Sequence, residues 1–282
     1  MTSFRTVKEI AIERAKECVE EVGNKFLDSV RPIYGISERS SPTPVLVGTC
    51  MFLKVDSKYF LVTAAHVIDH NRASTLYLGA GGSLFQIEGE FWETVAPGGD
   101  RIKDKMDFAF WCLAPSVINR LHDITFIDDS ELSRNRGTMD GRQFLVMGYP
   151  ISKNKDISAL ERAIRPKAWT YQSSFFDPGE KSAVEMGFSR SHHLFLKYDK
   201  RVGDYEGGLD NAIHPRGASG GTLIDLGLPN LANLASDAPC VGRLAGLFIE
   251  RKEKQKLLVF VRIGVIIDLI RERFSNKHAD EA

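Results

Sequence analysis

The sequence predicts an all-β fold, a sandwich or barrel, with one helix near each end of the chain. Short stretches rich in β-branched and aromatic residues recur along it, and turn-forming residues separate them. No amphipathic helix lies between these stretches, which argues against a parallel sheet built from βαβ units. Helical periodicity is found only at the two ends. With 43% apolar residues, a chain of 282 residues can bury a sizeable core, as one large domain or two small ones.

The first predicted element is a helix over residues 6–22. Thr6 and Glu9 form a T-x-x-E capping box, which satisfies two amide donors at the start of a helix. Gly23 and Asn24 predict its end. Packing of the helix on the body is the favoured interpretation, and docking of a partner is the alternative. One helix face is apolar, because steps of three and four join Val7, Ala11, Ala15, Cys18, Val22 and Phe26.

Residues 31–44 (RPIYGISERSSPTP) are rich in Pro, Ser and Gly and predict a linker, so residues 1–44 are expected to form an N-terminal helix and linker. A last apolar-periodic stretch, 265–274 (VIIDLIRERF), predicts a C-terminal helix, and residues 276–282 form a polar tail. Between them, strands are predicted at 45–55, 59–67, 74–80, 85–96, 107–114, 143–150, 168–176, 182–188, 193–199, 221–227, 243–250 and 257–263.

Composition excludes several classes of function. The 37 basic and 37 acidic residues cancel, so no nucleic-acid surface is expected. No apolar run is long enough to span a membrane, and the charged N-terminus lacks the apolar region of a signal peptide. The cysteines lie far apart without a C-x-x-C pair, so we expect reduced thiols in a cytoplasmic protein, no metal site and no cofactor. They are Cys18, Cys50, Cys112 and Cys240.

Three segments carry residues that can do chemistry together. In FLVTAAHVID (60–69), His66 is either a buried histidine with one hydrogen bond or a group that moves protons near neutral pH. In HPRGASGGTLID (214–225), the glycines around Ser219 either serve a surface turn or expose its hydroxyl and aim backbone N–H groups at one spot. In DKMDFAFWCLA (104–114), Asp107 either caps a turn or pairs with a histidine. Each signal is weak alone, but together they supply a nucleophile, a base and an acid.

The segments TAAHV, DFAF and GASGG, in this order, resemble the three signature segments of the chymotrypsin/trypsin-like serine proteases, of a bacterial, intracellular type. The resemblance covers residues 45–275. It implies two packed six-stranded antiparallel barrels, at about 45–118 and about 140–262. The catalytic triad then lies in the cleft between the two barrels.

The resemblance also implies an activity: hydrolysis of peptide bonds, through an acyl-enzyme intermediate, in a specific intracellular protein. Ser219 is expected to attack the peptide carbonyl, and His66 to take the serine proton and pass it to the leaving amine. Asp107 is expected to orient His66. The backbone N–H groups of Gly217 and Ser219 are expected to form the oxyanion hole.

The chain departs from the family pattern at several positions. Ala218 stands where digestive members have an Asp that pairs with a new N-terminus, so activation of a zymogen is not expected. Val67 stands where secreted members have a cysteine, which favours a cytoplasmic enzyme. Ile249 stands near the position of the serine that supports the catalytic Asp.

The substrate pocket is expected to contain Ile213 at its floor, together with His214 and Ile249. Because Ile213 is not an acid, the pocket has no obvious anchor for Lys or Arg. His214 can accept an acidic side chain, and a solvated turn histidine is the alternative interpretation.

Two other functions compete with this prediction. GASGG also matches the G-x-S-x-G nucleophile elbow of α/β-hydrolases, which needs an Asp and a His later in the chain. Only His278 follows Ser219, in the polar tail, so we reject that fold. The second alternative is a latent or non-catalytic trypsin-like fold that acts as a partner-binding or regulatory module. The helix over 6–22 lies outside the resemblance, and we expect it to regulate the enzyme or recruit a partner.

Overall fold

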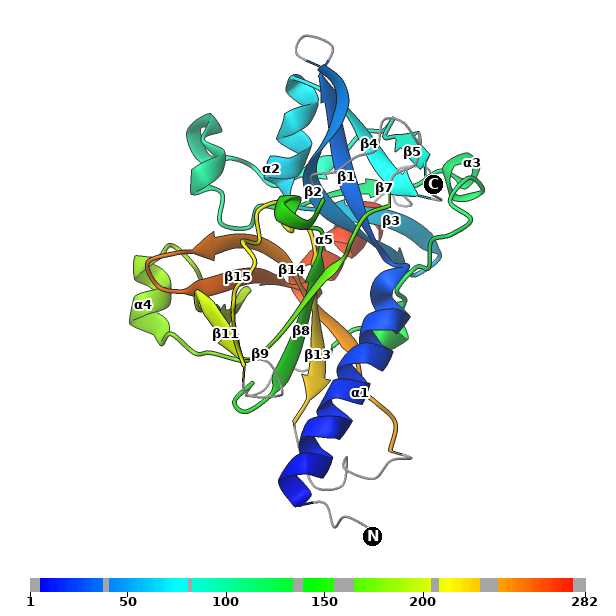
Figure 1. The fold of residues 1–282 in the computed structure, drawn as a ribbon. Helices are drawn as coiled ribbons and strands as arrows, with labels where there is room; N and C mark the ends of the chain where they lie inside the picture. The colour runs from blue at the N-terminus through cyan, green and yellow to red at the C-terminus, as the bar shows by residue number, and fades with distance from the viewer. Residues whose placement is uncertain are drawn as a thin grey trace.

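The computed structural model describes residues 6–37, 41–80, 83–133, 139–154, 165–203, 208–228 and 238–275. Two antiparallel β-sheets form the body, and a helix lies at each end of the described chain (Figure 1). This confirms the predicted fold class. The polar tail predicted at 276–282 lies outside the described residues. Among these residues, no helix is both long and apolar enough to cross a membrane.

Seven strands form the first sheet, where the resemblance implies six. Their order is β5-β4-β1-β2-β3-β7-β6, and all neighbours are antiparallel. The strands are β1 (Val30–Ser37), β2 (Ser41–Val55), β3 (Lys58–Thr63), β4 (Thr75–Ala80), β5 (Ser83–Gln86), β6 (Trp92–Glu93) and β7 (Ala109–Cys112).

The linker predicted at 31–44 is wrong, because β1 occupies its first half and β2 begins within it. Ile33 pairs with Gly48 of β2 on one side and with Leu78 of β4 on the other. Ile33 and Tyr34 are fully buried. Their apolar side chains therefore belong to the core, and this contribution outweighs the turn-forming composition around them.

Six strands form the second sheet, in the order β10-β15-β14-β13-β8-β9. An antiparallel bridge between Phe175 and Leu196 brings the end of β9 next to β10, so the sheet curls toward closure. The strands are β8 (Gln143–Gly148), β9 (Trp169–Ser174), β10 (His193–Lys197), β13 (Thr222–Gly227), β14 (Arg243–Lys252) and β15 (Leu257–Arg262). A separate hairpin joins β11 (Arg201–Gly203) and β12 (Leu209–Asn211).

The strand predicted over 182–188 is wrong, since this region contains α4 (Glu180–Glu185). Gly179, with a φ of 77°, turns the chain directly before this helix, and Ala183 is its buried residue. Only parts of the strand predicted over 85–96 form, as the end of β5 and as β6. Two further short helices are α2 (Ala65–Ile68) and α3 (Pro115–Ile118).

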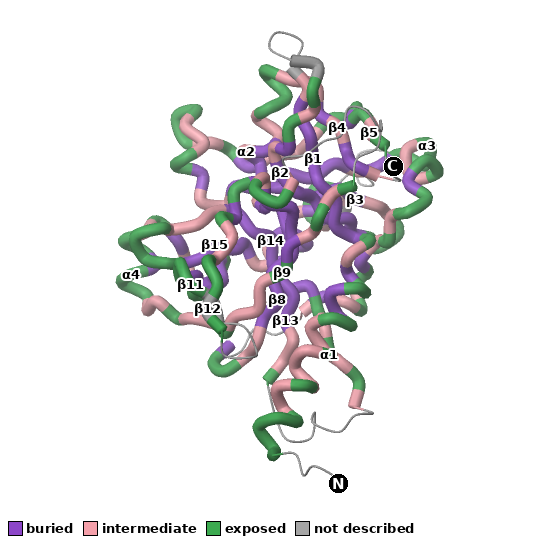
Figure 2. The backbone as a smooth tube through the Cα atoms, viewed as in Figure 1, coloured by how far each residue is buried: buried purple, intermediate pink, exposed green. Residues whose placement is uncertain are grey.

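One hydrophobic core cluster joins both sheets to the two terminal helices. Figure 2 shows this buried region running through the centre of the molecule. The C-terminal helix predicted at 265–274 is confirmed as α5 (Ile263–Ser275). The cluster includes Met51, Phe60 and Phe110 from the first sheet, Leu145, Leu247 and Val259 from the second, Phe26 from α1, and Ile266 and Ile270 from α5.

The N-terminal helix α1 spans Val7–Leu27 and therefore passes through the predicted stop at Gly23 and Asn24. Its predicted capping box is confirmed: the Glu9 amide donates to the Thr6 hydroxyl, and the Glu9 carboxylate accepts from the Thr6 amide. Gly23 is buried beside the second sheet, where an added Cβ would lie 3.9 Å from the Leu145 side chain, so the helix continues through it and packing does not demand a glycine there. The first half of α1 is more exposed than its second half (Figure 2). A regulatory role for this helix stays a prediction.

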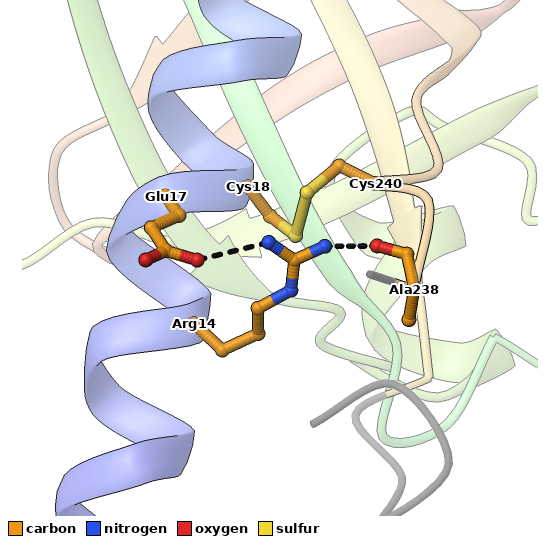
Figure 3. Close-up of a disulfide and its surroundings, with 5 residues drawn as sticks. All are labelled: Arg14, Glu17, Cys18, Ala238 and Cys240. Atoms are coloured by element: carbon orange, nitrogen blue, oxygen red, sulfur yellow. Dashed lines mark hydrogen bonds and ion pairs between the residues drawn. A yellow bond between two sulfur atoms is a disulfide. The ribbon is translucent and has the colours of Figure 1, made fainter. Parts of the chain in front are cut away.

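A disulfide between Cys18 and Cys240 corrects the expectation of four reduced thiols. Their Cα atoms lie 5.1 Å apart, because α1 packs beside the segment that leads into β14 (Figure 3). Arg14 strengthens the same contact by donating to the carbonyl of Ala238. Such bonds are typical of oxidising compartments, so the predicted cytoplasmic location loses one of its supports and stays a prediction.

Removing this disulfide is expected to lower the free energy of unfolding by about 2–4 kcal/mol, because it joins residues 222 positions apart and constrains the unfolded chain. The variant would carry Cys18→Ser and Cys240→Ser, and urea denaturation would be followed with and without reductant. Wild type should lose stability in reductant, while the double variant should not respond. An equal response of the two proteins would contradict the bond.

Candidate active site

The structure brings His66 and Asp107 together beside the paired ends of β3 and β7 in the first sheet. His66 belongs to α2, the single helical turn that follows β3. Its Nδ1 donates to Asp107 Oδ2 at 2.6 Å, and its backbone N–H donates to Oδ1 at 2.9 Å. The carboxylate thus fixes both the ring and the backbone of the histidine, and in the neutral ring with Nδ1–H the other nitrogen, Nε2, is the acceptor.

Asp107 is itself held by a second carboxylate. It is 7% exposed, and its backbone has a φ of 41°, a region that few residues other than glycine adopt. Asp104 Oδ1 accepts the Asp107 amide at 3.0 Å, and Asp104 Oδ2 accepts from Thr94 Oγ1 and from the Arg101 guanidinium. These bonds offset the cost of the unusual backbone conformation. Burial raises the pKa of the Asp107 carboxyl, and its hydrogen bonds with His66 oppose that shift.

Ile249 stands near the position where the family pattern has a supporting serine, and Asp104 holds the backbone of Asp107 rather than its carboxylate. Asp104 lies three residues before the catalytic candidate, and its side chain is almost fully buried. Asp104 was not predicted from the sequence, although a D-x-x-D spacing is the pattern of a carboxylate that accepts the amide of the residue three positions on.

Ser219 lies in the loop between β12 and β13 and is partly buried. Its hydroxyl donates to the backbone carbonyl of Ile249 at 3.3 Å, so its hydrogen bond in this structure is not to His66. The pairing of β14 with β15 shifts register at Ile249, which is how a strand carbonyl becomes available to the serine. Catalytic hydrogen bonds of this kind often form only when substrate is bound.

The backbone around Ser219 leaves two amides free. Ala218 N–H donates to Pro215 O, which closes a turn directly before the serine. Among the described residues, the N–H groups of Gly217 and Ser219 donate to no acceptor. These are the two amides that the sequence analysis assigned to the oxyanion hole. Gly217 has a φ of 93°, so glycine is needed for the loop to take this path.

Thr49 of β2 fastens the serine loop to the first sheet, and the sequence analysis missed it. Its N–H donates to the Ser219 carbonyl at 2.8 Å, and its hydroxyl donates to the Gly217 carbonyl at 2.9 Å. The same hydroxyl accepts the Tyr149 amide at 3.0 Å. A threonine within an apolar strand gives no local sign of this role, since all three partners are distant in sequence.

A cavity of about 440 Å³ contains the three candidate catalytic side chains. His66 and Asp107 come from the first sheet, and Ser219 comes from the second, so the cavity lies where the two sheets meet. Further lining residues are Arg101, Ile102, Asp104, His214, Pro215, Arg216, Phe248, Ile249, Glu250 and Arg251. A cavity with a few convergent polar groups is the expected form of a binding site.

Two of the three predicted pocket residues, His214 and Ile249, line this cavity. Ile213 is not among its lining residues, and it packs instead against the core of the second sheet. Its carbonyl accepts from the buried Tyr198 hydroxyl, which fixes the backbone just before the serine loop. Arg216 and Arg251, which the sequence analysis did not identify, also line the cavity.

His193 is a buried residue that does not line this cavity. Its Nε2 lies 2.8 Å from the Lys105 carbonyl oxygen, and its Nδ1 lies 2.9 Å from the Ser189 carbonyl oxygen. Desolvation by burial lowers its pKa. Across the described residues, no cluster of His, Cys, Asp and Glu has the makeup of a metal site.

Comparison with solved structures finds serine proteases. Neuropsin, a serine protease expressed in the limbic system of mouse brain, is similar with a TM-score of 0.52 and 10% identity, over 87% of this chain and 94% of neuropsin. The MamO protease domain from Magnetospirillum magneticum has a TM-score of 0.45 and 14% identity, over 86% of this chain and 96% of its own. The thermostable serine protease AL20 from an extremophilic microorganism has a TM-score of 0.47 and 12% identity, over 83% and 90%.

No protein-family model matches the chain, and no curated protein matches it in sequence. The similarity to neuropsin shows that the chain has the chymotrypsin/trypsin-like fold, as its motifs imply. At this identity, the similarity shows the fold alone.

Proposed function

We propose that this chymotrypsin-like fold is a serine endopeptidase that cleaves a specific protein substrate. The observation that carries the proposal is the His66–Asp107 pair, with 2.6 Å between Nδ1 and Oδ2, in the same cavity as Ser219. A serine next to two glycines, with unpaired amides at Gly217 and Ser219, supports the same role. Neuropsin, which has this fold, is a serine protease.

The proposed reaction has two stages. Ser219 Oγ attacks the peptide carbonyl while His66 Nε2 takes the serine proton, and the Gly217 and Ser219 amides stabilise the oxyanion. His66 then protonates the leaving amine, and an acyl-enzyme remains. Water hydrolyses this ester with His66 as the base. Asp107 stabilises the imidazolium at each stage.

Labelling by a fluorophosphonate probe tests the proposal. The probe reacts with a serine only where a base and an oxyanion hole activate it, so wild-type protein should be labelled. Ser219→Ala and His66→Ala should each abolish labelling. Ser83→Ala and His192→Ala change exposed residues away from the cavity and should label normally. Labelling that survives Ser219→Ala would contradict the proposal.

A latent or non-catalytic module that binds a partner is the second candidate function. The observation that favours it is the Ser219 hydroxyl, which donates to Ile249 rather than to His66. A folded wild-type protein that fails to label would support this candidate. Labelling that appears only after a binding partner is added would identify a latent protease.

A further inference from the structure

Besides Arg101, which pairs with Asp104, three basic side chains line the cavity beside Ser219: His214, Arg216 and Arg251. Among the described residues, Arg216 makes no ion pair, and its side chain is exposed. The lining carboxylates are already paired: Asp104 with Arg101, Asp107 with His66, and Glu250 with Lys252.

The Arg251 guanidinium is held in place by packing and is a hydrogen-bond donor toward the cavity. Its guanidinium lies over the Tyr198 ring, 5.2 Å from the ring centroid, and its side chain is only 14% exposed. Tyr198 is itself fixed, because it is buried and its hydroxyl donates to the Ile213 carbonyl. The outer Nη1 of Arg251 lies 3.6 Å from Glu253 Oε1, and a guanidinium is suited to a planar acceptor such as a carboxylate.

His214 presents a donor to the same place. The Arg216 amide donates to His214 Nδ1 at 3.2 Å, so in the neutral ring the proton lies on Nε2. Nε2 lies 3.4 Å from Glu253 Oε1. The loop before Ser219 therefore fixes the tautomer of His214 and makes the outer nitrogen a donor.

Glu253 shows where a carboxylate fits. One oxygen, Oε1, lies 3.4 Å from His214 Nε2 and 3.6 Å from Arg251 Nη1. Both distances exceed those of a tight charge-assisted hydrogen bond. The Glu253 side chain is 70% exposed, so it holds this place weakly and another carboxylate can displace it.

We infer that the cavity selects an acidic side chain, Glu or Asp, on the residue whose carbonyl Ser219 attacks. This inference rests on the proposed function and names its substrate class. The substrate carboxylate would take the place of Glu253 between His214 Nε2 and Arg251 Nη1. Arg216 at the rim would add a long-range attraction. Ile213 supports this site through its carbonyl bond to Tyr198 rather than through its side chain.

Binding to the Ser219→Ala protein tests the inference without turnover. The probes are two fluorescent tetrapeptides with free C-termini, identical except for a last residue of Glu or Gln, which mimic cleavage products. The Glu peptide should bind about 10²-fold more tightly than the Gln peptide. Arg251→Gln should abolish most of this preference, whereas Arg243→Gln, on the same strand and outside the cavity, should leave it intact.

Glu253→Gln is the converse variant. Because it removes the competing carboxylate, it should tighten binding of the Glu peptide by about two- to fivefold and leave the Gln peptide unchanged. The inference would be overturned if the Ser219→Ala protein, with no other change, bound the Glu peptide and the Gln peptide equally. This result is independent of fluorophosphonate labelling, which reports only on the catalytic residues.

Discussion

Asp107→Asn is expected to slow acyl-enzyme formation by about 10⁴-fold while the fold stays intact. The two carboxylate oxygens of Asp107 accept from the backbone and the ring of His66. An asparagine has one oxygen and one NH₂ group, so it can satisfy only the backbone N–H and must present NH₂ to the ring. His66 Nδ1 then becomes the acceptor, Nε2 carries the proton, and the ring no longer accepts a proton from Ser219.

The measurement is the second-order rate constant of inactivation by a fluorophosphonate, with circular dichroism as the check of folding. Asp199→Asn is the matched control, because Asp199 is exposed and pairs with Lys256 outside the cavity. It should react like wild type. A decrease of less than tenfold for Asp107→Asn would show that Asp107 does not orient His66.

Gly220→Ala is expected to lower the free energy of unfolding by about 3 kcal/mol or more. An added Cβ would lie 1.9 Å from the Thr49 carbonyl oxygen and 2.5 Å from the Thr63 hydroxyl. Gly220 also has a φ of 89°, where a side chain is strained. The two sheets would have to separate just behind Ser219, and the bonds from Thr49 to the serine loop would break.

Gly227→Ala is the control that separates the effect of the steric clash at Gly220 from the effect of the strained backbone conformation. Gly227 has nearly the same φ, 88°, and nothing lies within 4 Å of the position of its added Cβ. Gly227→Ala should therefore lower the free energy of unfolding by only about 1 kcal/mol, because a side chain is strained in the left-handed conformation. Urea denaturation of both variants makes the comparison. Equal losses would mean that the contact between Gly220 and Thr49 does not hold the sheets together.

Local sequence signals predicted most of the elements and the three candidate catalytic residues. The T-x-x-E capping box at Thr6 and the periodicity of residues 265–274 act within a few positions, so neighbouring residues are enough to reveal them. The strand before His66 and the motif around His66 can likewise be recognised from neighbouring residues alone. Residues 31–44 misled the prediction, because their turn-forming composition hid the apolar pair Ile33 and Tyr34.

The features that only the tertiary structure decided all join distant parts of the chain. Cys18 meets Cys240 because α1 packs against the second sheet, and Thr49 meets the serine loop because the two sheets face each other. Arg251 and His214 flank one carboxylate only once strand and loop are assembled. The sequence by itself determined most of the types of element and the three candidate catalytic residues, because local periodicity and hydrogen bonding set these. Sheet order and packing decided which groups meet, because contacts between distant residues depend on the register and burial of the whole fold.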